Sequence, residues 1–128
     1  MKTAILAFAA LALSASSLAA EAPWSYEAMK DAWLARRDSR DYQRYASEFV
    51  QYTNYYHVDQ KGNCYALSHE PVELMLIITQ PENDKFAQVE HVLSNVDNAK
   101  AQCFEKAYRG LRTRQPPYLP FVLQLQMN

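Results

Sequence analysis

The sequence predicts an α+β domain in which a small three-stranded antiparallel sheet carries helices packed on one face. Two segments in the first half, 25–37 and 41–57, repeat apolar side chains at helical spacing. Two later apolar segments, 72–79 and 85–93, are separated by a turn, and residues 121–127 alternate between apolar and polar side chains. With a further helix before the last strand, the predicted order is helix, helix, strand, strand, helix, strand, which is typical of an α+β arrangement.

The first 20 residues have the three regions of a secretory signal peptide. Lys2 supplies the positive charge, residues 4–13 form the apolar core, and small residues follow, with cleavage motifs that end at Ala19 and Ala20. The apolar core is shorter than the roughly 20 residues that span a bilayer. We therefore expect cleavage after Ala19 or Ala20 and a single domain over residues 21–128. The expected location is periplasmic or secreted, with no stable membrane insertion after cleavage.

The charge and the glycine content limit the classes of partner. The formal net charge is −1 and becomes −2 once Lys2 leaves with the signal peptide. This near balance gives no electrostatic reason to expect nucleic acid as a partner. The chain has two glycines, Gly62 and Gly110, which argues against a glycine-rich phosphate loop. No cofactor is expected.

Two cysteines, Cys64 and Cys103, both lie in the predicted mature domain. An exported chain meets an oxidising compartment, where two cysteines usually form a disulfide. The bridge closes a long loop, and loop-closure entropy gives it about 4 kcal/mol of stabilisation. Because typical net stabilities are about 5–15 kcal/mol, we expect this disulfide to matter for folding.

The two N-terminal helices have readable starts and one aromatic face. Ser25 can cap the first helix, and Ser39 or Asp41 can cap the second. The second helix carries an apolar stripe of Tyr42, Tyr45, Phe49, Tyr52 and Tyr56. Such a stripe usually faces the core. Tyr55 lies off the stripe, so we expect its ring to be exposed and available for binding.

The second half of the chain reads as a hairpin, a helix and a last strand. Pro71 disfavours helix before VELMLIIT, and the turn QPEND joins this strand to KFAQVEHVL as an antiparallel hairpin. The next helix is capped by Asp97 or Asn98 and ends at Gly110, and residues 111–117 form an extended connector. The final strand, FVLQLQM, has one polar side, which predicts an edge strand or an open sheet face.

Over residues 39–127 this order resembles the C-terminal domain of TonB and related periplasmic modules. In that family a helix leads to a β-hairpin, a second helix, a proline element and a final strand. The closest local match is QPP at residues 115–117, followed by PFVLQLQM, whereas the hairpin turn QPENDK lacks the glycine often found in the family. The resemblance implies this fold and a binding role in the cell envelope.

Three histidines, His57, His69 and His91, offer the main catalytic or metal-binding chemistry. Cys64 lies close to His69 in the sequence, but a disulfide-bonded cysteine is no nucleophile. The histidines also lack the usual zinc spacing of two His one helical turn apart with a Glu. We therefore expect neither catalysis nor a bound metal. A metal-binding protein that uses His69 and His91 is the least favoured alternative.

The connector and the last strand supply the remaining binding candidates. Arg112, Arg114 and Tyr118 surround the proline turn; they contact a partner or lie at a solvated helix end. Leu123 lies in the middle of the last strand, whose free edge could pair with a partner strand. The expected function is therefore a protein–protein interaction module with an envelope protein as partner. The alternative is a small secreted inhibitor of a hydrolase.

Overall fold

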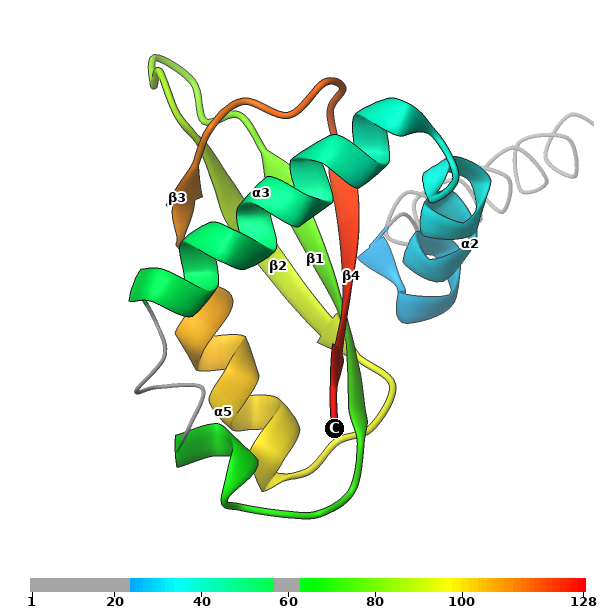
Figure 1. The fold of residues 1–128 in the computed structure, drawn as a ribbon, viewed down its shortest axis with the longest axis vertical. Coiled ribbons are helices and arrows are strands. Elements are labelled where there is room, and N and C mark those ends of the chain that lie inside the picture. Colours follow the sequence, from blue (N-terminus) through cyan, green and yellow to red (C-terminus); the bar gives the residue numbers. More distant parts are fainter. Residues whose placement is uncertain (1–23, 57–62) are drawn as a thin grey trace, which may run out of the picture.

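The computed structural model describes residues 24–56 and 63–128, and only the backbone of residues 54–56. The predicted signal peptide, His57 and Gly62 lie outside this part of the chain. The elements in chain order are α2 (Tyr26–Arg36), α3 (Arg40–Tyr56), β1 (Val72–Thr79), β2 (Ala87–Ser94), α5 (Ala99–Tyr108), β3 (Arg112–Thr113) and β4 (Phe121–Met127), as Figure 1 shows. Within the described residues, no helix is long and apolar enough to cross a bilayer.

The sheet is antiparallel and has the strand order β3-β2-β1-β4. β1 lies between its two long neighbours, with Leu76 opposite Val92 of β2 and Leu123 of β4. The predicted hairpin and the predicted edge position of the last strand are confirmed. The prediction of three strands is wrong, because β3 forms a fourth strand that pairs with the start of β2. Gly110, with a φ of 81°, lies in the turn between α5 and β3.

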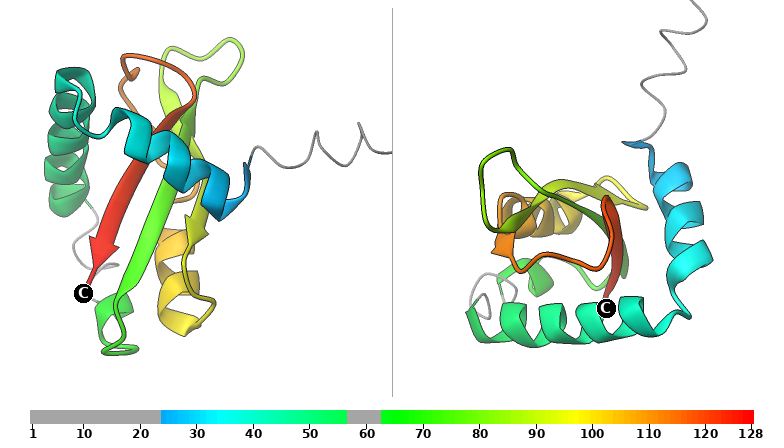
Figure 2. Two further views of the ribbon diagram at one scale, coloured as in Figure 1. Left: turned by 90° about the vertical axis from the view of Figure 1, so that its right-hand side faces the viewer. Right: turned by 90° about the horizontal axis from the view of Figure 1, so that it is seen from above.

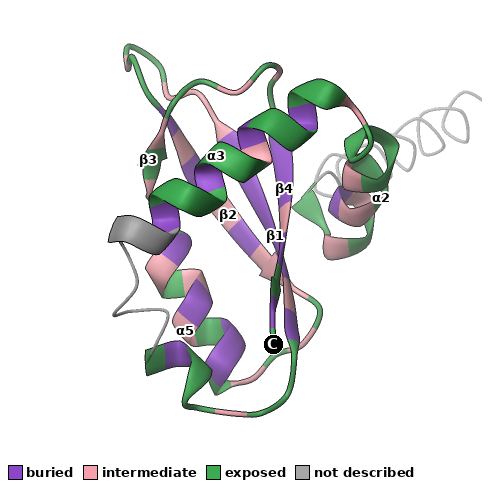
Figure 3. Cartoon of the chain, in the orientation of Figure 1, coloured by how far each residue is buried: buried purple, intermediate pink, exposed green. Residues whose placement is uncertain are grey.

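One face of the sheet forms the main core together with α3 and α5 (Figure 3). The buried side chains are Val72, Leu74, Leu76 and Ile78 from β1, Phe121, Leu123, Leu125 and Met127 from β4, and Tyr42, Tyr45, Phe49, Phe104 and Tyr108 from the two helices. Alternate residues of each strand share this face, as the sequence pattern predicts. The aromatic stripe of α3 is core as far as Phe49, and Tyr52 farther along the stripe is exposed.

α2 packs on the opposite face of the sheet, and Figure 2 shows α2 and α3 on different sides of the strands. Met29 of α2 is buried against Met75 and Ile77 of β1 and Val122 of β4. The prediction that the helices pack on one face is therefore wrong. The physical reason is that β1 is apolar on both faces, so its second face also needs a cover.

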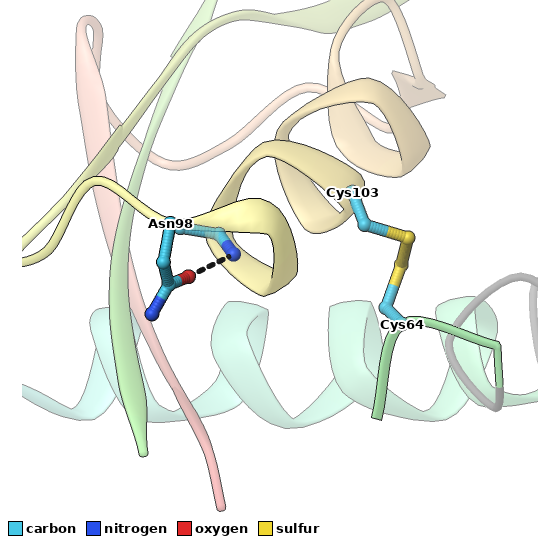
Figure 4. Close-up of a disulfide and its surroundings, with 4 residues drawn as sticks. Cys64, Asn98 and Cys103 are labelled. Atoms are coloured by element: carbon cyan, nitrogen blue, oxygen red, sulfur yellow. Dashed lines mark hydrogen bonds between the residues drawn. A yellow bond between two sulfur atoms is a disulfide. The ribbon is translucent and has the colours of Figure 1, made fainter. Parts of the chain in front are cut away.

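Side-chain caps and the disulfide hold the helices in place. The expected cap at Ser25 is present, and of the alternatives left open by the sequence, Ser39 bonds at the start of α3 and Asn98 caps α5. Asn98 Oδ1 accepts the Ala101 N–H at 2.8 Å (Figure 4).

The predicted disulfide joins Cys64 to Cys103, and Figure 4 shows it beside the first turns of α5. Cys64 is fully buried ahead of β1, and Cys103 lies on α5. The bridge therefore fixes the segment that leads into the central strand against a helix of the main core.

Candidate functional site

A groove of about 730 Å³ lies between α3 and the β3 edge of the sheet. α3 forms one side, and β3 with the residue before β2 forms the other; Figure 1 shows how α3 runs across this edge. The lining residues are Tyr45, Glu48, Phe49, Gln51, Tyr52, Phe86, Arg112, Thr113 and Arg114. The volume falls within the range of about 300–1,000 Å³ that is usual for ligand sites.

Tyr45 fixes the base of the groove. Its hydroxyl donates to the Arg114 carbonyl oxygen at 2.8 Å and lies 2.9 Å from Thr113 Oγ1. A phenol has one hydrogen, so the Thr113 hydroxyl is the donor in the second bond. Burial raises the pKa of Tyr45, so the hydroxyl stays protonated at neutral pH. These two bonds tie α3 to the strand across the groove.

Phe86 forms an apolar wall that is exposed yet held on an ordered turn. The residue is 47% exposed. The Phe86 N–H donates to Asp84 Oδ1 at 3.0 Å, and Gln80 Nε2 donates to the Phe86 carbonyl oxygen at 3.2 Å and also to that of Asp84. Side chains of the turn therefore bond to both the N–H and the carbonyl oxygen of Phe86, and this fixes its backbone.

Arg112, a predicted binding candidate, lies against this ring. Its guanidinium is 4.7 Å from the centroid of the Phe86 ring, and its Nη2 donates to Asp84 Oδ1 at 2.9 Å. The Phe86 N–H and then the Arg112 guanidinium lower the pKa of Asp84, so this carboxylate stays charged and orients both groups. The Arg112 side chain remains 60% exposed and can still meet a ligand.

Arg114, the second predicted arginine, also lines the groove. Its Nη2 pairs with the carboxylate of Glu48 on α3. The side chains of Arg114 and Glu48 are 73% and 45% exposed. Exposed ion pairs contribute only about 0–1 kcal/mol, so a carboxylate from a partner can compete for this guanidinium.

The other predicted binding residues do not line the groove. Tyr118 lies beside Arg36, whose guanidinium is 4.4 Å from the centroid of its ring. Leu123 is fully buried in the main core, so its side chain cannot contact a partner. The side chain of Tyr55 lies outside the described residues.

The free edge of β4 has a local cover. The backbone N–H of Gln124 donates to the hydroxyl oxygen of Tyr42 at 3.2 Å, and Trp33 Nε1 donates to the same oxygen at 2.8 Å. A partner strand would have to displace Tyr42 to reach the Gln124 N–H. The predicted strand pairing at this edge stays a prediction, and it meets this obstacle.

Glu73 forms a separate polar cluster on the α2 face. Its carboxylate accepts hydrogen bonds from the Tyr26 hydroxyl, from Lys30 Nζ at 3.2 Å and from Gln124 Nε2 at 3.1 Å. Burial alone would raise the pKa of Glu73, but the bonds from Tyr26, Lys30 and Gln124 outweigh it and hold the pKa below its ordinary value. The cluster joins α2 to β1 and β4, which is a structural task.

Two of the three histidines, His69 and His91, lie within the described residues. In the described residues no group of three or more His, Cys, Asp or Glu could hold a metal ion. His69 is exposed before β1. The His91 ring lies 5.2 Å from the Trp24 ring between centroids, and its Nε2 lies 3.7 Å from the carboxylate of Glu90.

The two arginines of the groove are predicted from the sequence, whereas Phe86 is predicted only as part of the strand 85–93. β2 begins one residue later, at Ala87. Phe86 falls on the same side of the predicted alternation as Gln88, Glu90 and Val92. A single exposed apolar side chain is common on protein surfaces, so this pattern alone does not mark a binding site.

Fold and groove together define the class: an α+β domain with one disulfide and an open aromatic groove rimmed by arginine. In comparisons with known proteins, no family model, no curated protein and no solved structure matches the chain. The function of the domain is therefore inferred from the geometry of the groove.

Proposed function

We propose that this protein is an exported binding domain of the periplasm or the secreted space, and that it contacts a protein partner through the groove beside Phe86. The observation that carries the proposal is the exposed Phe86 ring, held on an ordered turn and in contact with the Arg112 guanidinium. Aromatic and arginine side chains dominate the binding energy of many protein interfaces. The disulfide supports an oxidising location.

The relationship to the TonB C-terminal domain belongs to the same proposal. The order of helix, hairpin, helix and final strand over residues 39–127 supports it, as does the signal peptide that we expect at residues 1–20. We propose the groove rather than the β4 edge as the contact site, because the Tyr42 hydroxyl already occupies the Gln124 N–H.

Site-specific crosslinking in the native cell tests this function. A photo-reactive phenylalanine analogue replaces Phe86 in one chain and Leu34, an exposed residue of α2, in a control chain. We expect irradiation to give a discrete protein adduct from position 86 and not from position 34. Adding Arg112→Glu to the first chain should reduce the adduct yield about fivefold, since it removes a guanidinium that pairs with anionic groups. Equal adducts from both positions, or none from position 86, would refute the proposal.

A secreted inhibitor of a hydrolase is the second candidate. The turn between β1 and β2 projects from one end of the molecule in Figure 1, and bonds from Gln80 and Asp84 hold it. A held, projecting turn is what an inhibitor needs to enter a cleft. If the crosslinked partner is a hydrolase, the purified protein should lower its activity, and the Phe86→Ala variant should do so less.

A further inference from the structure

We infer that the groove takes an extended peptide segment in which a large apolar side chain and an acidic side chain stand two residues apart. This inference rests on the proposed function, because it names the chemistry of the partner segment. It follows from the length of the groove, from its apolar surface and from the position of its charges.

The length of the groove fits a short extended segment. The lining residues on α3 run from Tyr45 to Tyr52, which at the helical rise per residue corresponds to about 10 Å. An extended chain advances about 3.3 Å per residue, so about three peptide residues match this length. The groove is therefore suited to a piece of backbone with its side chains.

The apolar surface supplies a slot for one large side chain. Phe49 is buried in the core beneath the groove, and the residues Phe86 and Tyr52 are 47% and 44% exposed. Burying an apolar side chain against these rings is favourable, and aromatic rings pack both edge-to-face and stacked. A phenylalanine or leucine side chain of a partner would cover the exposed part of Phe86.

The arginine donors favour an anion. Arg112 pairs with Asp84 and Arg114 pairs with Glu48, so the formal charges of these two pairs balance. Each of these ion pairs uses the Nη2 atom of its arginine. A guanidinium has five N–H donors in a planar fork, so each arginine can donate to a further carboxylate.

The position of Arg112 links the two parts. Because its guanidinium lies 4.7 Å from the centroid of the Phe86 ring, a carboxylate bound to Arg112 lies beside the apolar wall. In an extended chain, side chains two residues apart share one face and lie about 7 Å apart. The acidic residue and the apolar residue of the segment are therefore expected to be two residues apart.

Titration of the exported, disulfide-bonded protein with defined peptides tests the inference. The probes are acetylated, amidated pentapeptides that hold the pairs Phe-Glu, Phe-Gln, Ala-Glu or Phe-Lys with one glycine between the two residues and one at each end. Each is named by its pair, and NMR amide shifts report binding. We expect the Phe-Glu peptide to shift the amides of Phe49, Phe86 and Thr113. The Phe-Gln and Ala-Glu peptides should bind about fivefold more weakly or worse. Equal binding of all four peptides would overturn the inference.

A charge reversal separates a specific contact from general attraction. Arg114→Glu should weaken the Phe-Glu peptide and strengthen the Phe-Lys peptide, because it reverses the charge at the groove. Arg44→Glu is the matched control, since Arg44 is an exposed residue of the same helix outside the lining. Equal weakening by both variants would show that net charge alone attracts the peptide, against the inference.

A further arm separates a peptide from a small aromatic acid, which shares its chemistry. If 3-phenylpropionate binds as tightly as the Phe-Glu peptide, the groove is a small-molecule site and the peptide inference is wrong. If the peptides fail while position 86 still crosslinks a protein, the partner chemistry is wrong and the proposed function stands. If both fail, both proposals are wrong.

Discussion

Glu73 is the residue whose charge connects α2 to the sheet. Its side chain is 14% exposed and accepts bonds from Tyr26, Lys30 and Gln124. A carboxyl whose pKa is lowered in the folded state stabilises that state above its unfolded pKa. The stabilisation from Glu73 is thus complete above its ordinary value of 4.5 and is lost as pH falls through the lowered value.

Glu73→Gln should therefore destabilise the protein at neutral pH and much less in acid. We expect a loss of about 1–2 kcal/mol at about pH 7, because a neutral amide accepts weaker bonds than a carboxylate. Urea midpoints of wild type and variant at about pH 7 and about pH 3 measure the difference. Glu82→Gln, in an exposed turn, is the control and should match wild type at both values. A Glu73→Gln deficit of the same size in acid would contradict the assignment.

Tyr45→Phe tests the bonds that tie α3 to the far wall of the groove. The variant leaves the Arg114 carbonyl and the Thr113 hydroxyl without the Tyr45 hydroxyl. At about 1 kcal/mol for each bond, we expect a loss of about 1–2 kcal/mol in the free energy of unfolding, read from urea unfolding.

Tyr65→Phe is the matched control for this loss. The Tyr65 hydroxyl donates to the thioether sulfur of Met127 at 3.2 Å, and a thioether is a weak acceptor. It should therefore lose clearly less stability than Tyr45→Phe. Equal losses would mean that the Tyr45 bonds do not hold the groove together.

At the scale of helices and strands, the long periodic segments could be predicted from the sequence. The shortest strand, β3, and the sheet face that α2 covers could not. The repeated apolar positions of α3 and the alternation in β1 reflect one buried face each, so both elements follow from sequence. β3 has two residues, which is too short to show alternation. α2 buries Met29 alone, so its sequence does not tell which sheet face it covers.

The groove was only half predictable for a similar reason. It combines α3, the residue before β2, and β3, which are distant in the sequence. Arg112 and Arg114 stand out as charges near a helix end, but their contacts with Asp84 and Glu48 depend on the fold. The position of Phe86 depends on the turn that ends at it, and the bonds from Gln80 and Asp84 could not be predicted from the sequence spacing.

The start of α5 offers a prediction at the scale of one helix. Asn98→Ala removes the side-chain oxygen that accepts the Ala101 N–H, and should cost about 1 kcal/mol in the free energy of unfolding. Thermal and urea unfolding measure the loss, and amide exchange should speed up in the first turn of α5. Asn98→Asp keeps an acceptor at the cap and is the control. Wild-type stability of Asn98→Ala would show that the cap contributes nothing.

At the scale of the whole molecule, the disulfide spans the part of the chain that builds the sheet centre. Cys64 and Cys103 are 39 residues apart, and β1 and β2 both lie between them. Both faces of β1 depend on separate covers, α3 with α5 on one side and α2 on the other. A cross-link between the segment before β1 and α5 therefore restricts the unfolded chain over the part that forms β1 and β2.

Replacing both cysteines, Cys64→Ser with Cys103→Ser, should lower the free energy of unfolding by about 4 kcal/mol, the loop-closure value for a bridge of this length. Urea unfolding of the oxidised wild type, the reduced wild type and the double variant measures it. The reduced wild type should match the variant, because both lack the same cross-link. Expression should then depend on compartment: an exported wild type folds, whereas the same domain kept in a reducing cytosol shows the low stability of the variant. Equal unfolding midpoints for oxidised and reduced protein would contradict both the stabilising role of the bridge and the argument that export makes this domain stable.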